Sequence, residues 1–133
     1  MGFAAAKARH LRLGAFGERV ARRVLESKGF GILLTNHRNR GGEIDIIALD
    51  GIELCFVEVK TRRSGSWARP AENLSARQRE RISRAAEIYM SEIGSPRLPR
   101  RFDVVEVLVG RWDVDSVWHW VGVEMGGGRG RRF

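Results

Sequence analysis

Hydrophobic residues recur at helical spacing in two segments of the chain. From Leu13 to Lys28 an apolar residue appears every three or four positions, and Gly29 follows as a typical helix stop. A second run of this spacing follows Ser75, which begins a Ser-x-x-Gln capping box, and this run ends at Gly94. The pattern therefore predicts two amphipathic helices, one over residues 13–28 and one between Ser75 and Gly94.

The remaining apolar runs predict strands, because they are short, rich in β-branched residues and bounded by turn residues. The predicted strands are 30–35, 44–49, 52–60, 102–109 and 114–121. Residues 36–42 and 62–73 are predicted loops. The element order is αβββαββ, which indicates a small α/β domain. We expect one domain over residues 1–125, with its core at 14–121, and a flexible basic tail at 126–133.

Charged residues interrupt the two central strands. The Asp50-Gly51 pair favours a two-residue hairpin turn, which would place Leu49 opposite Ile52 and Asp45 opposite Phe56. Opposed residues share a face of a hairpin, and successive side chains alternate between its faces. One face would then present, at a single end, Glu43, Asp45, Glu58 and Lys60. The other face would carry Ile44, Ile46, Ala48, Cys55, Val57 and Val59.

Three carboxylates beside one lysine repel one another unless a cation neutralises them. Hard oxygen ligands suit Mg²⁺ or Mn²⁺ rather than zinc. Such an ion can activate water and offset the charge of a phosphoryl transition state, and Lys60 could orient that water, so phosphodiester hydrolysis fits the cluster. The alternative is an exposed face on which Lys60 pairs with Glu58 and no metal binds.

The charge of the chain points to a polyanionic partner. The net charge is +8, and almost all the cations are arginine, the side chain best suited to bidentate phosphate contact. Nucleic acid, most naturally DNA, is the expected partner. The candidate phosphate contacts are Arg62, Arg63, Arg77, Arg129, Arg131 and Arg132. The other arginines of the second helix are interpreted as a solvated face. No segment reaches the apolar length of a spanning helix, so we expect a cytoplasmic protein without a membrane partner.

Several residues allow two interpretations. Glu18 lies at the border of the first helix's apolar stripe, so it either reaches the acidic cluster or is a first-turn acid favoured by the helix dipole. Asp103 either lies near the cluster or pairs with Arg101. Trp67 could stack on a base, although covering the core is the commoner role.

The cysteine and the histidines give no sign of further chemistry. Cys55 is the single cysteine and falls on an apolar face, which favours a core role rather than a nucleophile. The three histidines are far apart in the sequence and do not form a zinc-binding spacing; they are His10, His37 and His119.

Taken together, several motifs resemble a known family. They are Gly17-Glu18 with Ala21, Asn36, the run from Gly41 to Asp45, the run from Phe56 to Arg62, and the run from Arg101 to Val105. With these motifs the chain resembles the YraN-like family of small bacterial proteins of unassigned function. That family is similar to the Holliday-junction-resolvase-like branch of the PD-(D/E)xK, or restriction-endonuclease-like, nucleases. The match spans roughly residues 14–109.

The resemblance implies a restriction-endonuclease-like fold, with a mixed central sheet flanked by helices, and a role for each acidic residue. Asp45 and Glu58 would be metal ligands, with Glu43 beside them, Glu18 an auxiliary acid and Lys60 the base that orients water. The implied activity is metal-dependent cleavage of branched or structured DNA, in which a homodimer would act on two strands. The alternatives are a nucleic-acid-binding module that does not turn over and a homodimeric assembly protein. Arg77 stands where the family would be expected to have a lysine.

Overall fold

The computed structural model describes residues 3–65, 74–95 and 97–125. The predicted element order αβββαββ is confirmed. In chain order, the elements are α1 (Phe3–Ser27), β1 (Gly31–Asn39), β2 (Gly42–Asp50), β3 (Glu53–Arg63), α3 (Ala76–Glu92), β4 (Arg100–Val109) and β5 (Val114–Trp120). Two of the predictions, the role of Trp67 and the flexible tail at 126–133, concern residues that lie outside the described ranges.

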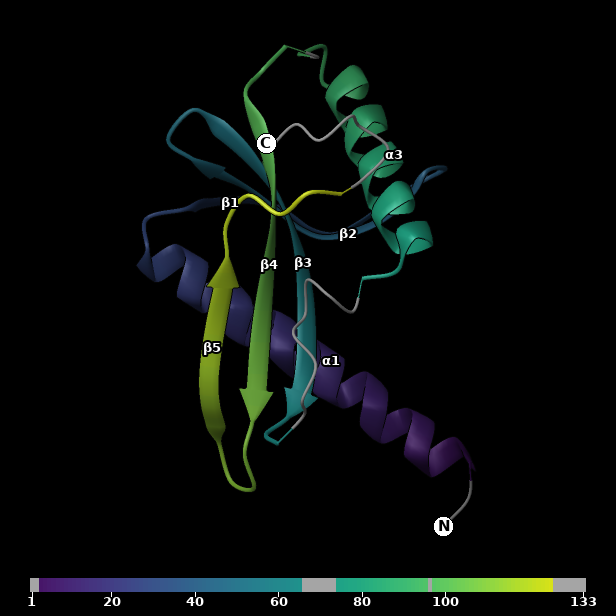
Figure 1. Cartoon of the computed structure of the whole chain (residues 1–133), viewed down its shortest axis with the longest axis vertical. Coiled ribbons are helices and arrows are strands. Elements are labelled where there is room, and N and C mark those ends of the chain that lie inside the picture. Colours follow the sequence, from purple (N-terminus) through teal and green to yellow (C-terminus); the bar gives the residue numbers. More distant parts are fainter. Residues whose placement is uncertain (1–2, 66–73, 96, 126–133) are drawn as a thin grey trace.

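The five strands form one mixed sheet in the order β1-β2-β3-β4-β5. Only β3 and β4 are parallel, and the chain crosses between them through α3. Helix α1 passes behind β3, β4 and β5, whereas α3 lies against the other face near β1 and β2 (Figure 1). The sheet is thus covered by one helix on each face, and the expected mixed α/β architecture is confirmed.

Each helix buries its own core against the sheet. The core beneath α1 is built from Ala21, Leu25, Phe30, Ile46, Ala48, Cys55, Val57, Val105 and Val107. The core beneath α3 includes Ile44, Ile47, Leu54, Phe56, Ile82, Tyr89, Phe102 and Val104. Because strand residues alternate between these two cores, β3 is apolar on both sides until Val57 and becomes polar at Glu58.

Helix α1 begins at Phe3 rather than near Leu13, as the apolar pattern predicted. Residues 4–9 are mostly alanine and basic residues, which favour helix without an apolar stripe, so hydrophobic periodicity did not reveal them. Gly29 ends the helix as predicted, with a φ of 90°. Neither described helix is apolar over enough of its length to cross a membrane.

The predicted register of the β2–β3 hairpin is wrong by two positions. Asp50 pairs with Glu53, so the turn is Gly51-Ile52 rather than Asp50-Gly51. Leu49 therefore pairs with Leu54 instead of Ile52, and Phe56 pairs with Ile47 instead of Asp45. Because the shift is even, it does not exchange the two faces. The paired part of the hairpin, residues 46–50 with 53–57, therefore keeps its predicted faces despite the wrong register.

A second correction concerns Ile44. It was predicted to share a face with Ile46, but it packs in the α3 core together with Ile47. The described β2–β3 pairing ends at Ile46 and Val57, and β2 continues alongside β1 alone. The predicted opposition of Glu43 and Glu58 is not formed, because β2 has turned away from β3 at that point.

The predicted loop 36–42 is largely a strand. β1 runs to Asn39, and only a tight turn separates it from Gly42 at the start of β2. Asn36 has a positive φ of 52° within β1, a conformation typical of turns that asparagine tolerates better than most residues. The loop prediction therefore reflects a real local irregularity at Asn36. The residues before and after it still pair with β2, so the segment remains a strand.

Candidate metal and nucleic-acid site

Helix α1 approaches β3 unusually closely at Gly17. A Cβ atom at this position would overlap the side chain of Thr61, including its Cβ at 2.8 Å. Only glycine therefore lets the helix backbone rest on β3 one residue beyond Lys60. The next residue of the helix is Glu18, so this close contact sets where the Glu18 carboxyl group enters the site.

The four predicted catalytic residues line one hollow of about 230 Å³. Its lining residues are Leu13, Gly14, Glu18, Asp45, Glu58, Val59, Lys60 and Thr61. The hollow forms along the edge of β3 that β2 leaves beyond Val57, so residues from both faces of β3 reach it. The structure thus brings together side chains from α1, β2 and β3, as the metal-site hypothesis requires.

Asp45 takes over a backbone position that the sheet leaves open. Its Oδ2 accepts a hydrogen bond from the Val59 amide at 2.8 Å. That amide lies beyond the last described β2–β3 pair, so it has lost its strand partner, and the carboxylate replaces a carbonyl oxygen. The separation of the two strands is therefore what turns Asp45 toward β3 and fixes one of its oxygens.

The Asp45 and Glu58 carboxyl groups are hydrogen-bonded to each other. Burial is the largest cause of the pKa shift of each group. Burial, followed by the charge of Asp45, raises the pKa of Glu58 to about 9. Burial also raises the pKa of Asp45, although the Val59 amide opposes that change. The nearby Lys60 charge favours ionisation of both acids but does not offset the burial. The pair consequently retains a proton at a pH where exposed acids have lost theirs.

Glu18 responds to the same environment. Its pKa is raised first by burial and then by the charge of Asp45, while a hydrogen bond from the Asn36 side chain opposes the change. Of its two predicted interpretations, the structure therefore favours an acid that reaches the cluster. Asn36 belongs to the family motif, but nothing in the sequence predicts that its side chain contacts Glu18.

The donor set consists of carboxylate oxygens, which suit a hard divalent cation. While no cation is bound, burial prevents these groups from ionising together. A bound cation would lower their pKa values and displace the shared proton. Within residues 3–65, 74–95 and 97–125, no three acidic, histidine or cysteine side chains are already arranged around one point. Asp45 and Glu58 would have to separate from each other to bind an ion, and Glu18 is the third acid that lines the same hollow.

Glu43 lies outside this hollow. It lines an adjoining one of about 180 Å³ together with Glu58, Gln78, Arg81 and Ile82. Its carboxylate also lies 3.4 Å from Arg38 of β1, which follows from the pairing of these residues across the β1–β2 hairpin. Glu43 is thus separated from Asp45 and Glu18 and contributes to the main hollow only through its charge.

The predicted phosphate contacts occupy different settings. Arg62 lies 3.6 Å from Glu106, and its side chain is only 16% exposed, so it serves an ion pair within the sheet. Arg63 is exposed at the end of β3, and Arg77 is exposed on α3. Three further candidates, Arg129, Arg131 and Arg132, lie outside the described residues.

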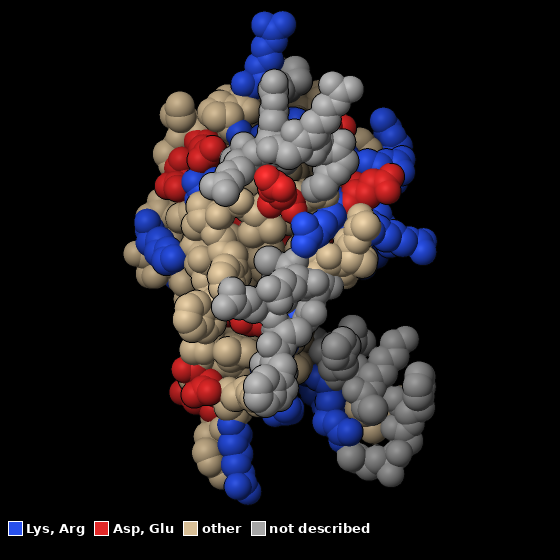
Figure 2. Space-filling model, viewed as in Figure 1, with Lys and Arg blue, Asp and Glu red and all other residues tan. Residues whose placement is uncertain are grey.

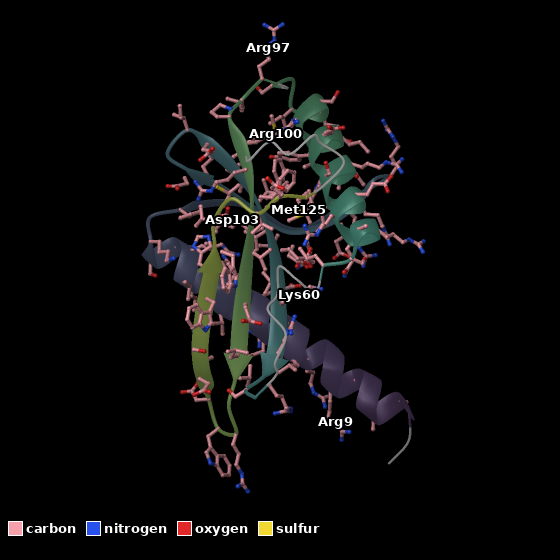
Figure 3. All side chains as sticks on the ribbon, viewed as in Figure 1. Arg9, Lys60, Arg97, Arg100, Asp103 and Met125 are labelled. Atoms are coloured by element: carbon pink, nitrogen blue, oxygen red, sulfur yellow. The ribbon has the colours of Figure 1, made fainter. Side chains whose placement is uncertain are left out.

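The remaining open residues belong elsewhere. Asp103 pairs with Arg101 at 3.0 Å and with His119 at 2.8 Å, on the α1 side of the sheet, so its second interpretation is confirmed. Figure 3 shows Asp103 and Lys60 at separate levels of the sheet. Cys55 is fully buried, which confirms its core role, and burial raises its pKa to about 12.

Comparisons with known proteins place the chain in a family. The model of the Uncharacterised protein family UPF0102 matches residues 17–107. A UPF0102 protein of Chlorobaculum parvum is 47% identical over 105 residues, which cover 79% of this chain and 81% of that protein. A UPF0102 protein of Alkaliphilus metalliredigens is 44% identical over 99 residues, 74% of this chain and 87% of its own length. One from Nocardia farcinica is 45% identical over 97 residues, with coverages of 73% and 76%.

These names state no activity, but the family match includes the segments that supply Glu18, Asp45, Glu58 and Lys60. The family-level resemblance expected from the sequence is confirmed. The chain belongs to the uncharacterised protein family UPF0102.

Proposed function

We propose that this protein is a divalent-metal-dependent endonuclease that hydrolyses phosphodiester bonds in structured or branched DNA. The observation that carries the proposal is the convergence of three acids and one lysine in a single hollow. The raised pKa values of Glu18, Asp45 and Glu58 add support, because they indicate an acidic site that a cation would stabilise. Membership of the PD-(D/E)xK nuclease superfamily is part of this proposal and rests on the resemblance of the motifs.

The residues divide the chemistry among them. Asp45 and Glu58 would hold Mg²⁺ or Mn²⁺, which when bound activates water and offsets the charge on the phosphoryl group. The Val59 amide keeps one Asp45 oxygen in place, and the Asp45 carboxyl group is also hydrogen-bonded to Glu58. Lys60 supplies positive charge and a hydrogen-bond donor at the same hollow, where it would orient the attacking water. Glu18, which reaches the hollow from α1, would be the auxiliary acid of the site.

A cleavage panel tests the proposal. Purified protein is incubated with duplex, single-stranded, flap and four-way-junction DNA in Mg²⁺, in Mn²⁺ and in EDTA. We expect metal-dependent cleavage of at least one structured substrate, reduced by about 100-fold or more in Asp45→Asn and Glu58→Gln, which lose a ligand charge. Glu26→Gln is the matched control, because Glu26 is an exposed acid of α1 paired with Arg22.

A protein that cuts no substrate and binds neither metal by calorimetry would overturn the proposal. The alternative function is then a nucleic-acid-binding module, which the direct Asp45–Glu58 hydrogen bond favours because it leaves the two acids paired without an ion. A homodimer is compatible with either function. The exposed edge strand β5, where the Trp118 side chain is 54% exposed, is the surface we would examine first.

A further inference from the structure

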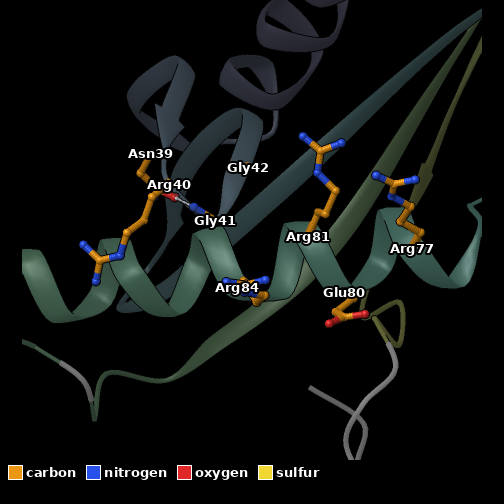
Figure 4. A pocket seen from close by; sticks show the side chains of 8 residues that line it. All are labelled: Asn39, Arg40, Gly41, Gly42, Arg77, Glu80, Arg81 and Arg84. Carbon is orange, nitrogen blue, oxygen red and sulfur yellow. Dashed lines mark hydrogen bonds between the residues drawn. The ribbon is translucent and has the colours of Figure 1, made fainter.

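A second hollow, of about 370 Å³, lies along the outer side of α3. Its lining residues are Asn39, Arg40, Gly41, Gly42, Arg77, Glu80, Arg81 and Arg84. Four arginines therefore share one hollow with a single acid. Figure 4 shows Arg77 and Arg81 extending from the same side of α3, with Arg40 reaching the helix from the β1–β2 turn. In Figure 2 basic side chains extend from the side of the molecule that α3 occupies.

This hollow is built by close packing rather than by chance exposure of basic residues. A Cβ atom at Gly41 would lie 2.8 Å from the Ala85 amide nitrogen and 2.9 Å from the Arg84 carbonyl carbon. One at Gly42 would lie 3.1 Å from the Arg81 carbonyl oxygen. The two glycines therefore let the turn rest directly on the helix backbone, which carries Arg40 to the arginines of α3.

Asn39 fixes the turn in this position. Its Nδ2 donates a hydrogen bond to the Ala85 carbonyl at 3.0 Å, and its Oδ1 accepts one from the Gly41 amide at 2.8 Å. The side chain thus joins the turn to the helix and closes the turn at the same time. This arrangement holds Arg40 near α3 before any ligand arrives, which reduces the entropy lost on binding.

The arginines of this hollow have their charge available. Among the described residues, the salt bridges formed by arginine involve Arg22, Arg38, Arg62, Arg100 and Arg101, and none involves Arg40, Arg77, Arg81 or Arg84. All four are exposed. Guanidinium groups gathered in this way repel one another, and an anion with several charges would relieve that repulsion while accepting bidentate hydrogen bonds.

The hollow leads toward the acidic site. Arg81 also lines the hollow that contains Glu43 and Glu58, and Glu58 in turn lines the hollow that contains Asp45 and Lys60. The arginine hollow and the acidic site are therefore linked through two shared residues. Along α3, Arg77 and Arg84 are separated by a rise of about 10 Å, which equals about three phosphate steps of one strand measured along the axis of a duplex.

From this continuity we infer that Arg40, Arg77, Arg81 and Arg84 form a groove that binds the DNA phosphate backbone next to the bond at the acidic site. The inference rests on the proposed function for the identity of the bond, although the groove can bind DNA whether or not that bond is cut. The groove contacts phosphates rather than bases, so its contribution to affinity is electrostatic and largely independent of sequence. Arg81 is the positioning residue at the junction of the two sites.

Fluorescence anisotropy in EDTA, with a labelled four-way junction and a labelled duplex, tests the groove without any turnover. The full chain is compared with Arg40→Gln/Arg84→Gln and with the control Arg23→Gln/Arg97→Gln, which removes the same charge at exposed positions on α1 and beyond α3. We expect the groove variant to bind at least about tenfold more weakly in 100 mM salt and to lower the logarithmic salt slope by about two units. The control should change affinity by less than about threefold.

Equal losses in the two variants would overturn the groove, because net charge alone would then explain binding. Displacement by polyglutamate as effective as displacement by unlabelled DNA of equal charge would also overturn it and would indicate an acidic protein partner. The cleavage panel separates the two proposals. Groove-dependent binding without any cleavage removes the nuclease assignment and keeps the groove, whereas cleavage that the groove variant retains at wild-type affinity removes the groove and keeps the nuclease.

Discussion

The sheet contains two clusters of buried acids that are neutralised in opposite ways. On the α1 side, Asp103 is fully buried but accepts hydrogen bonds from Arg101, His119 and the Gly122 amide. Despite burial, these partners hold the pKa of Asp103 below its usual value. At the β3 edge, Asp45 and Glu58 have each other as close partners, and their pKa values rise. The difference indicates that one cluster is neutralised within the fold, whereas the charges of the other are not offset by the side chains around it.

Arg101 is the residue that neutralises the acids of the α1-side cluster. Its guanidinium group contacts Asp103 at 3.0 Å, Asp50 at 2.9 Å and Glu53 at 2.8 Å, and so joins β4 to the tip of the β2–β3 hairpin. Lys60 has no comparable effect on Asp45 and Glu58, since the pKa values of both acids remain raised beside it. A buried network with all its partners contributes to the stability of the fold, and one without them is more typical of a binding or catalytic site.

The largest expected difference comes from matched substitutions in the two clusters. Asp103→Asn would place amide hydrogens against the donors Arg101, His119 and Gly122, so we expect a loss of about 3–5 kcal/mol in the free energy of unfolding. Asp45→Asn keeps an oxygen for the Val59 amide and removes a buried charge, so it should leave metal-free stability unchanged or raise it. Urea unfolding at pH 7 measures both. Equal losses would contradict the distinction between the clusters.

Added metal should have the next largest effect. An ion that binds only the folded protein stabilises it by about 2.7 kcal/mol at a concentration of one hundred times its Kd. Mn²⁺ or Mg²⁺ should therefore raise the melting temperature of the wild type but not that of Asp45→Asn. Buffers of matched ionic strength without the divalent metal provide the control, because added salt also screens surface charge. An equal shift in both proteins would place the metal outside this cluster.

The sequence predicted the element order and most of the acidic site because both depend on local periodicity. Glu58 and Lys60 follow an apolar run in one strand, so their common face was fixed by alternation alone. The predicted hairpin register was wrong because it gave the two turn positions to Asp50 and Gly51, whereas Gly51, with a φ of 63°, and Ile52 occupy them. Ile44 was wrong because β2 leaves β3, and no local pattern records where two strands separate.

The arginine groove could not be predicted for a related reason. Gly41 and Gly42 are visible in the sequence, but their role depends on a helix that follows more than thirty residues later, as the contact between Gly41 and Ala85 shows. Spacing along α3 places Arg77, Arg81 and Arg84 near one another, and it predicted a phosphate contact for Arg77 but only a solvated face for the other two. Only the packed turn adds Arg40 to them and makes the face a hollow.

The pH dependence of stability sharpens the comparison further. Folding raises the pKa of Glu58 from 4.5 to about 9, so the folded state holds a proton that the unfolded state releases. The free-energy cost of burying an ionisable Glu58 is absent below pH 4.5, grows as the pH rises, and reaches its full value above about pH 9. Metal-free stability should therefore fall over this range, by at most about 1.4 kcal/mol per pH unit for one proton.

Glu58→Gln tests this pH dependence, since the amide cannot ionise. At pH 8 in EDTA we expect this variant to be more stable than the wild type by more than about 1 kcal/mol, with the difference shrinking as the pH falls and disappearing below about pH 4.5. Denaturant unfolding across the range, with Glu26→Gln as the exposed control, provides the measurement. A difference that stays constant with pH would mean that Glu58 is ionised in the folded protein.

The smallest expected effect lies at the edge of the α1-side cluster. Lys28 Nζ donates a hydrogen bond to His119 Nδ1 at 2.9 Å, and this contact is exposed, unlike the bond between His119 Nε2 and Asp103. Lys28→Met should therefore cost only about 0.5–1 kcal/mol, because water can replace the lysine. The ¹⁵N chemical shifts of His119 should still report a proton on Nε2, since Asp103 accepts from that nitrogen. A loss above about 2 kcal/mol, or a proton moved to Nδ1, would show that Lys28 is needed to complete the cluster and that its neutralisation extends to the protein surface.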